Sequence, residues 1–200
     1  MSDGTSHEGR AGGDGGAAYA ALGTDGSKGR KLFCLSGAVA KPGIYEVEFG
    51  ITLRQLIDLG GGMRNGSTMQ AILLGGAAGG FVGPSDLDLP LTMEATRAAG
   101  SSLGSGVVMV LDQSVDMVDQ LRRIAAFFRD ESCGQCVPCR VGTVRQEEIV
   151  SRLAKGVQSQ DIELLRELGT VMRDASICGL GQTANSAIDS AIIKLKVFAV

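Results

Sequence analysis

The sequence predicts an α+β fold in which a small sheet domain precedes a bundle of four helices. Two observations lead to this prediction. Between residues 29 and 111, short apolar runs alternate with glycine and proline turns, as they do in sheet proteins. From Ser114 onward, apolar residues recur every three or four positions, as they do in amphipathic helices. A chain of 200 residues with 44% hydrophobic content can bury the core that such a fold needs.

The first 28 residues are dominated by Gly, Ala, Ser and Asp. They contain too few large apolar side chains to offset the entropy lost on ordering. We therefore expect a flexible Gly-rich tail over residues 1–28, with Ala17–Leu22 as its one candidate for regular structure. Lys31–Ser36 and Ile44–Val47 then flank the turn Lys41-Pro42-Gly43, and this arrangement predicts a β-hairpin.

A short helix should follow the hairpin. Thr52 can cap its N-terminus and the glycines at 60–62 end it. Its buried face consists of apolar residues at helical spacing, Leu53, Leu56 and Ile57. Met69–Leu74 and Gly106–Leu111 are further strand candidates. The order hairpin, helix, strand, long loop, strand suits a small β-grasp (ubiquitin-like) domain over residues 29–111.

The remaining residues, 112–200, predict a helical domain. A first apolar stripe with helical spacing is formed by Val115, Val118, Leu121, Ile124 or Ala125, and Phe128. The pattern repeats in three later segments, Val144–Leu153, Ile162–Met172 and Ala184–Phe198. Four amphipathic helices in succession predict a four-helix bundle that carries the iron-sulfur cluster discussed below.

Composition excludes several functional classes. The net charge of -3 includes no basic block, so we expect no nucleic-acid binding. The only histidine, His7, lies in the tail, which removes a Ser-His-Asp triad or a His-ligated zinc site from the folded part. The sequence has no apolar stretch of about 20 residues and no secretory leader. We therefore expect a cytoplasmic protein without direct membrane insertion, peripheral to a membrane only through partner subunits.

Four of the five cysteines lie in the last third of the chain. In a reducing cytosol, clustered cysteines are more often ligands or core residues than disulfides. Cys133, Cys136 and Cys139 have the spacing C-x2-C-x2-C, and three thiols spaced in this way can wrap one compact cluster, as in ferredoxin-type sites. Cys178, in the loop before the last helix, would supply the fourth thiolate. The sequence therefore predicts one 4Fe-4S cluster on these four residues.

Two other interpretations of these cysteines stay open. Free cysteines are often simply buried, and four cysteines can also hold a structural zinc ion, although such zinc sites usually show two separated C-x2-C pairs. Arg140 and the amides of the loop could offset the negative charge of a cluster. Cys34 stands alone inside the apolar run Lys31–Ser36, so we interpret it as a core residue outside the site.

Two segments around the cysteines resemble a known family. Residues 131–143 have the sequence ESCGQCVPCRVGT, and residues 176–183 have the sequence SICGLGQT. Together with residues 31–62 and 103–112, they resemble the flavin-carrying, NADH-binding subunit of respiratory complex I. Related subunits occur in NAD-dependent formate dehydrogenases and NAD-reducing hydrogenases. The likeness extends from residue 17 to residue 182 and concerns only the C-terminal part of that family.

The resemblance implies a β-grasp soluble-ligand-binding (SLBB) domain that leads into a helical domain, with Cys133, Cys136, Cys139 and Cys178 as cluster ligands. In such relatives the cluster takes single electrons from reduced FMN and passes them to clusters in partner subunits. The family's FMN- and NADH-binding half has no counterpart in these 200 residues. We therefore expect FMN and NADH only on a partner or a missing domain, and no NADH oxidation by the chain alone.

The expected function is electron transfer through one 4Fe-4S cluster, as a module of an NADH-linked oxidoreductase of the complex I, formate dehydrogenase or hydrogenase diaphorase type. Expected partners are a flavoprotein NADH-binding subunit or domain and other iron-sulfur subunits. One alternative is a non-catalytic redox-sensing or assembly protein that uses the β-grasp domain for binding. Another is a zinc-stabilised scaffold.

Overall fold

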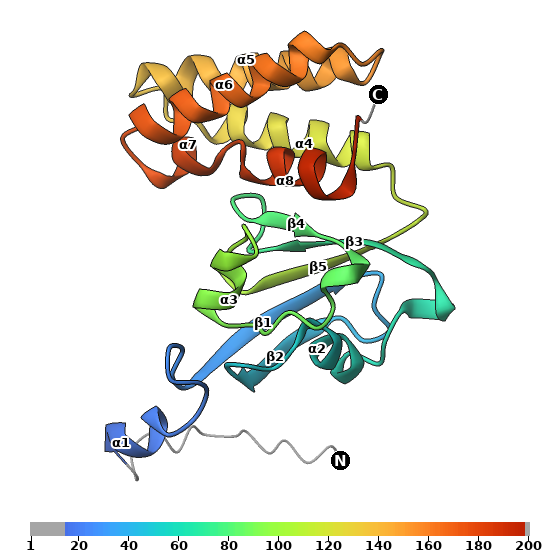
Figure 1. The fold of residues 1–200 in the computed structure, drawn as a ribbon, viewed down its shortest axis with the longest axis vertical. Helices are drawn as coiled ribbons and strands as arrows, with labels where there is room; N and C mark the ends of the chain where they lie inside the picture. Colours follow the sequence, from blue (N-terminus) through green and yellow to red (C-terminus); the bar gives the residue numbers. More distant parts are fainter. Residues whose placement is uncertain (1–14, 199–200) are drawn as a thin grey trace, which may run out of the picture.

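The computed structural model describes residues 15–198. Within this range one sheet is built from β1 (Arg30–Gly37), β2 (Gly43–Glu48), β3 (Met69–Leu74), β4 (Gly80–Val82) and β5 (Val107–Asp112). The helices that precede the last strand are α1 (Gly15–Ala20), α2 (Leu53–Leu59) and α3 (Met93–Ala98). The later helices are α4 (Met117–Glu131), α5 (Val137–Leu153), α6 (Ser159–Ala175), α7 (Gly179–Thr183) and α8 (Ser186–Leu195). The protein is thus a mixed α/β structure (Figure 1).

The strand order across the sheet is β2-β1-β5-β3-β4. β1 and β2 form the predicted hairpin, which is confirmed, and they pair in antiparallel fashion. The last strand, β5, lies at the centre, where it runs parallel to β1 and antiparallel to β3. β2 and β4 are therefore the two edge strands.

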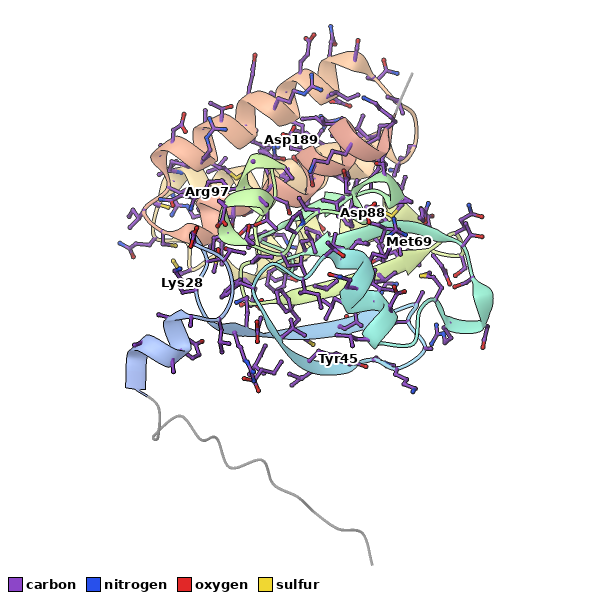
Figure 2. All side chains as sticks on the ribbon, turned by 60° about the horizontal axis from the view of Figure 1, so that its bottom comes forward. Lys28, Tyr45, Met69, Asp88, Arg97 and Asp189 are labelled. Atoms are coloured by element: carbon purple, nitrogen blue, oxygen red, sulfur yellow. The ribbon has the colours of Figure 1, made fainter. Side chains whose placement is uncertain are left out.

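Both faces of the sheet are covered where β3 lies. Successive side chains of a strand point to opposite faces, and on β3 this places Ala71 and Leu73 on one side and Ile72 and Leu74 on the other. Ala71 and Leu73 belong to the core that contains the buried faces of α4, α5, α6 and α8. Ile72 and Leu74 belong to a second core with the apolar face of α2. The C-terminal helices gather on one side of the sheet (Figure 1). In Figure 2, Asp189 lies in this helical layer and Tyr45 lies on the far strand β2.

The helix predicted after Thr52 is confirmed as α2. The Thr52 side chain accepts a hydrogen bond from the backbone N–H of Gln55, and the Gln55 side chain accepts one from the N–H of Thr52. Such a cap stabilises a helix by about 1 kcal/mol. The strand predicted at Met69–Leu74 is confirmed with the same bounds. The predicted loop before β5 contains three elements that the sequence did not reveal: β4, the 3-10 helix η2 (Pro84–Asp86) and α3.

Residues 15–28 are more regular than the predicted tail. They include α1, and the Tyr19 hydroxyl donates a hydrogen bond of 3.1 Å to the carbonyl oxygen of Arg30. Ser27 is buried and donates a hydrogen bond of 2.7 Å to the Glu94 carboxylate. Ser27 and Glu94 are 67 positions apart, so amino-acid composition alone cannot predict this contact. For residues 1–14 the tail prediction lies outside the described residues.

The four helices predicted from the apolar stripes correspond to α4, α5, α6 and α8, although their bounds differ from the predicted ones. α5 begins at Val137 rather than at Val144, because Pro138 has a backbone conformation suited to the first helical turn. The last helix, predicted over Ala184–Phe198, ends at Leu195, where the next residue is left-handed with φ of 57°. Of the helices within residues 15–198, none has the length and hydropathy required for a membrane span.

Candidate metal centre

The C-x2-C-x2-C run lies at the junction between α4 and α5. Cys133 is exposed in the loop that follows α4, and Cys136 is the N-cap residue of α5. Cys139 lies in the first turn of α5 and is only 5% exposed. Gly134, with φ of 74°, lets the loop bend between the first two cysteines. The run therefore begins in a loop and ends in the first turn of a helix.

Cys178 comes from a different part of the chain and is the N-cap residue of α7. The turn between α6 and α7 packs against the beginning of α5. At Gly181, an added Cβ atom would lie 2.8 Å from the Cβ atom of Cys139. This close approach brings the segment that carries Cys178 next to the buried cysteine of the run.

The Cys139 thiol is affected by its burial and by the other three cysteines of the predicted site. Burial raises the pKa of the Cys139 thiol above its ordinary value, and the negative charges of Cys136, Cys178 and Cys133 raise it further. The Ser132 hydroxyl opposes this increase by hydrogen bonding to the Cys139 sulfur. The Cys133, Cys136 and Cys178 sulfurs are therefore close enough to Cys139 for their charges to act on its thiol.

Cys136 has the opposite shift. The backbone N–H of Ile177, and then that of Cys139, hold the pKa of the Cys136 thiol below its ordinary value. These donors favour the thiolate, which is the form that binds iron. The N-terminus of α5, a helix of 17 residues, adds the positive end of its dipole at the same point.

Two serines at the site were missed by the sequence argument. The Oγ atom of Ser132 lies 3.3 Å from the Sγ atom of Cys139. Ser176 is buried, and its Oγ atom has no hydrogen-bond partner in the described part of the chain. Each serine stands one or two residues before a cysteine of the site, and this position is the signal that could have revealed them.

Neighbouring contacts hold α5 in place. The Thr143 hydroxyl donates a hydrogen bond of 2.9 Å to the carbonyl oxygen of Cys139, and the Gln146 side-chain amide donates one of 3.0 Å to that of Ala184. Arg129 on α4 forms an ion pair with Glu147 on α5. The exposed side chain of Arg140 passes the loop, since a Cβ atom on Gly134 would lie 3.7 Å from the Arg140 Cδ atom. A positive charge is therefore available beside the cysteines.

Cys34 corrects one expectation. It is exposed, so the prediction that it packs in the core is wrong. The alternation of β1 is the reason, because Phe33 and Leu35 take the inward positions and Cys34 faces the other way. It lies on the sheet and the four clustered cysteines lie among the helices, so its exclusion from the site agrees with its place in the fold.

Within residues 15–198, no three His, Cys, Asp or Glu side chains are grouped closely enough to hold a single metal ion.

Two protein-family models match successive parts of the chain. Residues 32–82 match the SLBB domain, and residues 119–197 match the NADH-ubiquinone oxidoreductase-F iron-sulfur binding region. The chain has an SLBB domain followed by an F-type iron-sulfur region. The SLBB match covers β1 to β4, and the F-type iron-sulfur region covers the helical layer with all four cysteines.

Relatives of the SLBB domain and the F-type region occur in NADH- and NADP-linked complexes. The NADP-reducing hydrogenase subunit HndC of Solidesulfovibrio fructosivorans is 39% identical over 85% of this chain and 35% of that protein. The F-type subunit of the NADH-quinone oxidoreductase of Mycobacterium bovis is 38% identical over 87% of this chain and 39% of that protein. A crystal structure of an NAD+-reducing NiFe-hydrogenase in the H2-reduced state matches with a TM-score of 0.82, at 36% identity over 92% of this chain and 31% of that chain. The chain thus spans 35% and 39% of the length of these two curated relatives.

The F-type iron-sulfur region indicates a 4Fe-4S cluster as the cofactor. The residues present fit this group on two counts. Cysteine thiolates are the usual ligands of such clusters, and the region contains four cysteines, three of which act electrostatically on the buried Cys139. In the described part of the chain, the buried Ser176 hydroxyl has no hydrogen-bond partner, so it is available to donate a hydrogen bond to a ligand sulfur.

Proposed function

We propose that this chain relays single electrons through one 4Fe-4S cluster held by Cys133, Cys136, Cys139 and Cys178. The observation that carries the proposal is the approach of the α6–α7 turn to the α4–α5 junction. It places Cys178 in the surroundings of the buried Cys139, although the two residues are 39 positions apart in the sequence. When bound, such a cluster accepts and releases one electron at a time.

The protein's own groups have separate tasks in this proposal. Cys139, buried in the first turn of α5, anchors the site inside the helical layer. The N–H groups of Ile177 and Cys139 and the Ser132 hydroxyl offset negative charge on the thiolates. Cys133 and Cys178 are exposed, so the site reaches the protein surface on the side from which a redox partner could approach.

We further propose that the module works in the cytoplasm within an NADH-linked oxidoreductase. NADH and FMN would bind to a flavoprotein partner subunit or domain, and other iron-sulfur subunits would receive the electrons. The names of the relatives support this, since they are subunits of NADH-quinone oxidoreductase and of a NADP-reducing hydrogenase. Splitting the two electrons of a hydride donor requires a flavin beside a one-electron carrier.

For the architecture, we propose a β-grasp domain followed by a four-helix bundle, with the division near residue 111. The mixed sheet with β5 at its centre and α2 against one face supports the first assignment. The packing of α4 with α5, and of α5 with α6, in one core that includes α8 supports the second.

The experiment that tests the proposal is anaerobic reconstitution of the full chain with iron and sulfide. We expect about four iron and four sulfide per chain and the broad cysteinate-to-iron absorption. Serine in place of Cys133, Cys136, Cys139 or Cys178 should reduce this content, and the matched Cys34→Ser variant should keep it. Zinc in place of iron in protein purified without oxygen, or the same loss in the Cys34 variant, would contradict the assignment.

The same reconstituted protein tests whether the flavin and NADH bind to another subunit or domain. Dithionite should bleach the visible absorption of the reconstituted chain, while NADH with free FMN should do so far more slowly. Adding a flavoprotein partner subunit should restore reduction by NADH. Rapid reduction by NADH with the chain alone would contradict the idea that the flavin lies elsewhere.

A redox-sensing or assembly protein is the second candidate, favoured by a groove beside β2. The groove has a volume of about 860 Å³ and is lined by β2, by the loop after it and by α2, with charged residues that include Arg30, Glu48 and Asp58. In that case oxygen-driven loss of the cluster should change the affinity of a co-purifying partner. Partner binding that is equal in the iron-loaded and iron-free chains would exclude this candidate.

A further inference from the structure

Ser132 has a hydroxyl proton available for a sulfur atom. Its Oγ atom lies 3.3 Å from the Cys139 Sγ atom and also accepts a hydrogen bond of 3.4 Å from the backbone N–H of Gly134. In the free thiol, either atom of the Ser132–Cys139 pair can be the donor. An iron-bound thiolate has no proton, so the hydroxyl is then the only donor of this pair.

Ser176 presents a second hydroxyl to the same site. Its backbone groups are engaged, since its N–H donates to the Met172 carbonyl and its carbonyl accepts from the Gln182 side chain. Its buried Oγ atom has no partner in the described part of the chain, which is unfavourable unless something accepts its proton. An added Cβ atom on Gly181 would lie 2.3 Å from this Oγ and 2.8 Å from the Cys139 Cβ, so the hydroxyl and the buried cysteine both lie against the start of α7. The Ser176 hydroxyl is also one of the groups that hold the pKa of the Cys136 thiol below its ordinary value, which identifies the Cys136 sulfur as the thiol it faces.

We propose that Ser132 and Ser176 are positioning residues that raise the reduction potential of the site by donating O–H···S hydrogen bonds, from Ser132 to the Cys139 sulfur and from Ser176 to the neighbouring Cys136 sulfur. This inference rests on the proposed function, because it requires a 4Fe-4S cluster on the four cysteines. A proton directed at a ligand sulfur stabilises the more negative, reduced state more than the oxidised state. Removing either hydroxyl should therefore lower the potential.

The decisive measurement is a redox titration of the anaerobically reconstituted full chain, with dithionite as reductant and the EPR signal of the reduced protein as readout. Ser132→Ala and Ser176→Ala should each lower the equilibrium constant for one-electron reduction by up to about tenfold, which corresponds to about 59 mV. Ser132→Thr retains a hydroxyl and should restore a value close to that of the unmutated chain. Ser186→Ala is the matched control, since it removes an exposed hydroxyl from α8 and should leave the potential unchanged.

Iron and sulfide are counted on every sample before the titration. If the alanine variants hold the full complement and titrate at the unmutated potential, the proposal is wrong. The Ser132→Ala variant tests the role of the Ser132 hydroxyl without disturbing the fold. Ser132 is only half-buried, so removal of its hydroxyl leaves no cavity in the core. If the unmutated chain binds no iron, the proposed function itself fails, and the iron count identifies that outcome before any potential is measured.

Discussion

The hydroxyl oxygen of Ser190 on α8 accepts a hydrogen bond of 2.8 Å from the backbone N–H of Phe81 on β4. β4 is an edge strand, and edge strands leave backbone groups without a strand partner. The serine satisfies one such group and itself donates to the carbonyl oxygen of Ala187. The helical layer that carries the cysteines is therefore joined to the sheet by a buried polar contact in addition to the shared apolar core.

We expect Ser190→Ala to lower the free energy of unfolding by about 1–3 kcal/mol, because the buried Phe81 N–H loses its acceptor. Urea denaturation followed by circular dichroism measures the effect. Ser186→Ala, an exposed serine on the same helix, should stay within about 0.5 kcal/mol of the unmutated chain. Equal losses in the two variants would show that the contact with β4 contributes nothing.

Glu94 on α3 fixes the segment that precedes β1. Its carboxylate accepts hydrogen bonds from the Ser27 hydroxyl at 2.7 Å and the Thr24 hydroxyl at 3.3 Å. The Ser27 hydroxyl is the main reason that the pKa of Glu94 lies below its ordinary value of 4.5. A carboxyl group whose pKa is lowered by folding stabilises the folded state above the unfolded pKa, and this contribution is lost as the pH falls through the lowered value.

The stability of the protein should therefore decrease as the pH is lowered below about 4.5, and part of this decrease should vanish in Glu94→Gln. Urea midpoints at pH 7, 5, 4 and 3 give the slope. Ser27→Ala removes the main donor, so it should flatten the slope as well, and the double variant should add little to either change. A Glu94→Gln slope identical to that of the unmutated chain would rule out this linkage.

The strands and helices with strong local signals could be predicted from the sequence. The Thr52 cap and the glycines that follow defined α2, and the run Met69–Leu74 defined β3. α3 was missed within a proline-containing loop, although Thr92 caps it and Glu94 and Arg97 suit its first and last turns. β4 has only three residues, too few for a period to show.

The four candidate ligands could be selected from the sequence, but the side chains around them could not be predicted. Spacing identified Cys133, Cys136 and Cys139, and the single remaining clustered cysteine completed the set. The contact between Ser132 and Cys139 depends on where α4 ends and α5 begins, and the start of α5 was predicted seven residues too late. Ser176 and Gly181 approach Cys139 only through the packing of α7 on α5, which no local pattern encodes.

Gly181 is the position where a single methyl group tests the site most directly. In the structure an alanine Cβ at this position would lie 2.3 Å from the Ser176 Oγ and 2.8 Å from the Cys139 Cβ, closer than real Cβ atoms come to their neighbours. Neither neighbour has room to retreat, because Cys139 is 5% exposed and Ser176 is 7% exposed. We expect Gly181→Ala to displace the α7 turn from α5 and to reduce the iron and sulfide content after anaerobic reconstitution.

Gly179, two residues earlier in α7, is the matched control because an added Cβ atom there meets nothing within 4 Å. Alanine is the better helix former by about 1 kcal/mol, so Gly179→Ala should retain full iron content and lose no stability. Iron and sulfide per chain are the primary measurement, and the urea midpoint of each iron-free variant separates damage to the site from loss of the fold. Equal iron content in the two variants would mean that the approach of Gly181 to Cys139 is not needed to gather the four thiols.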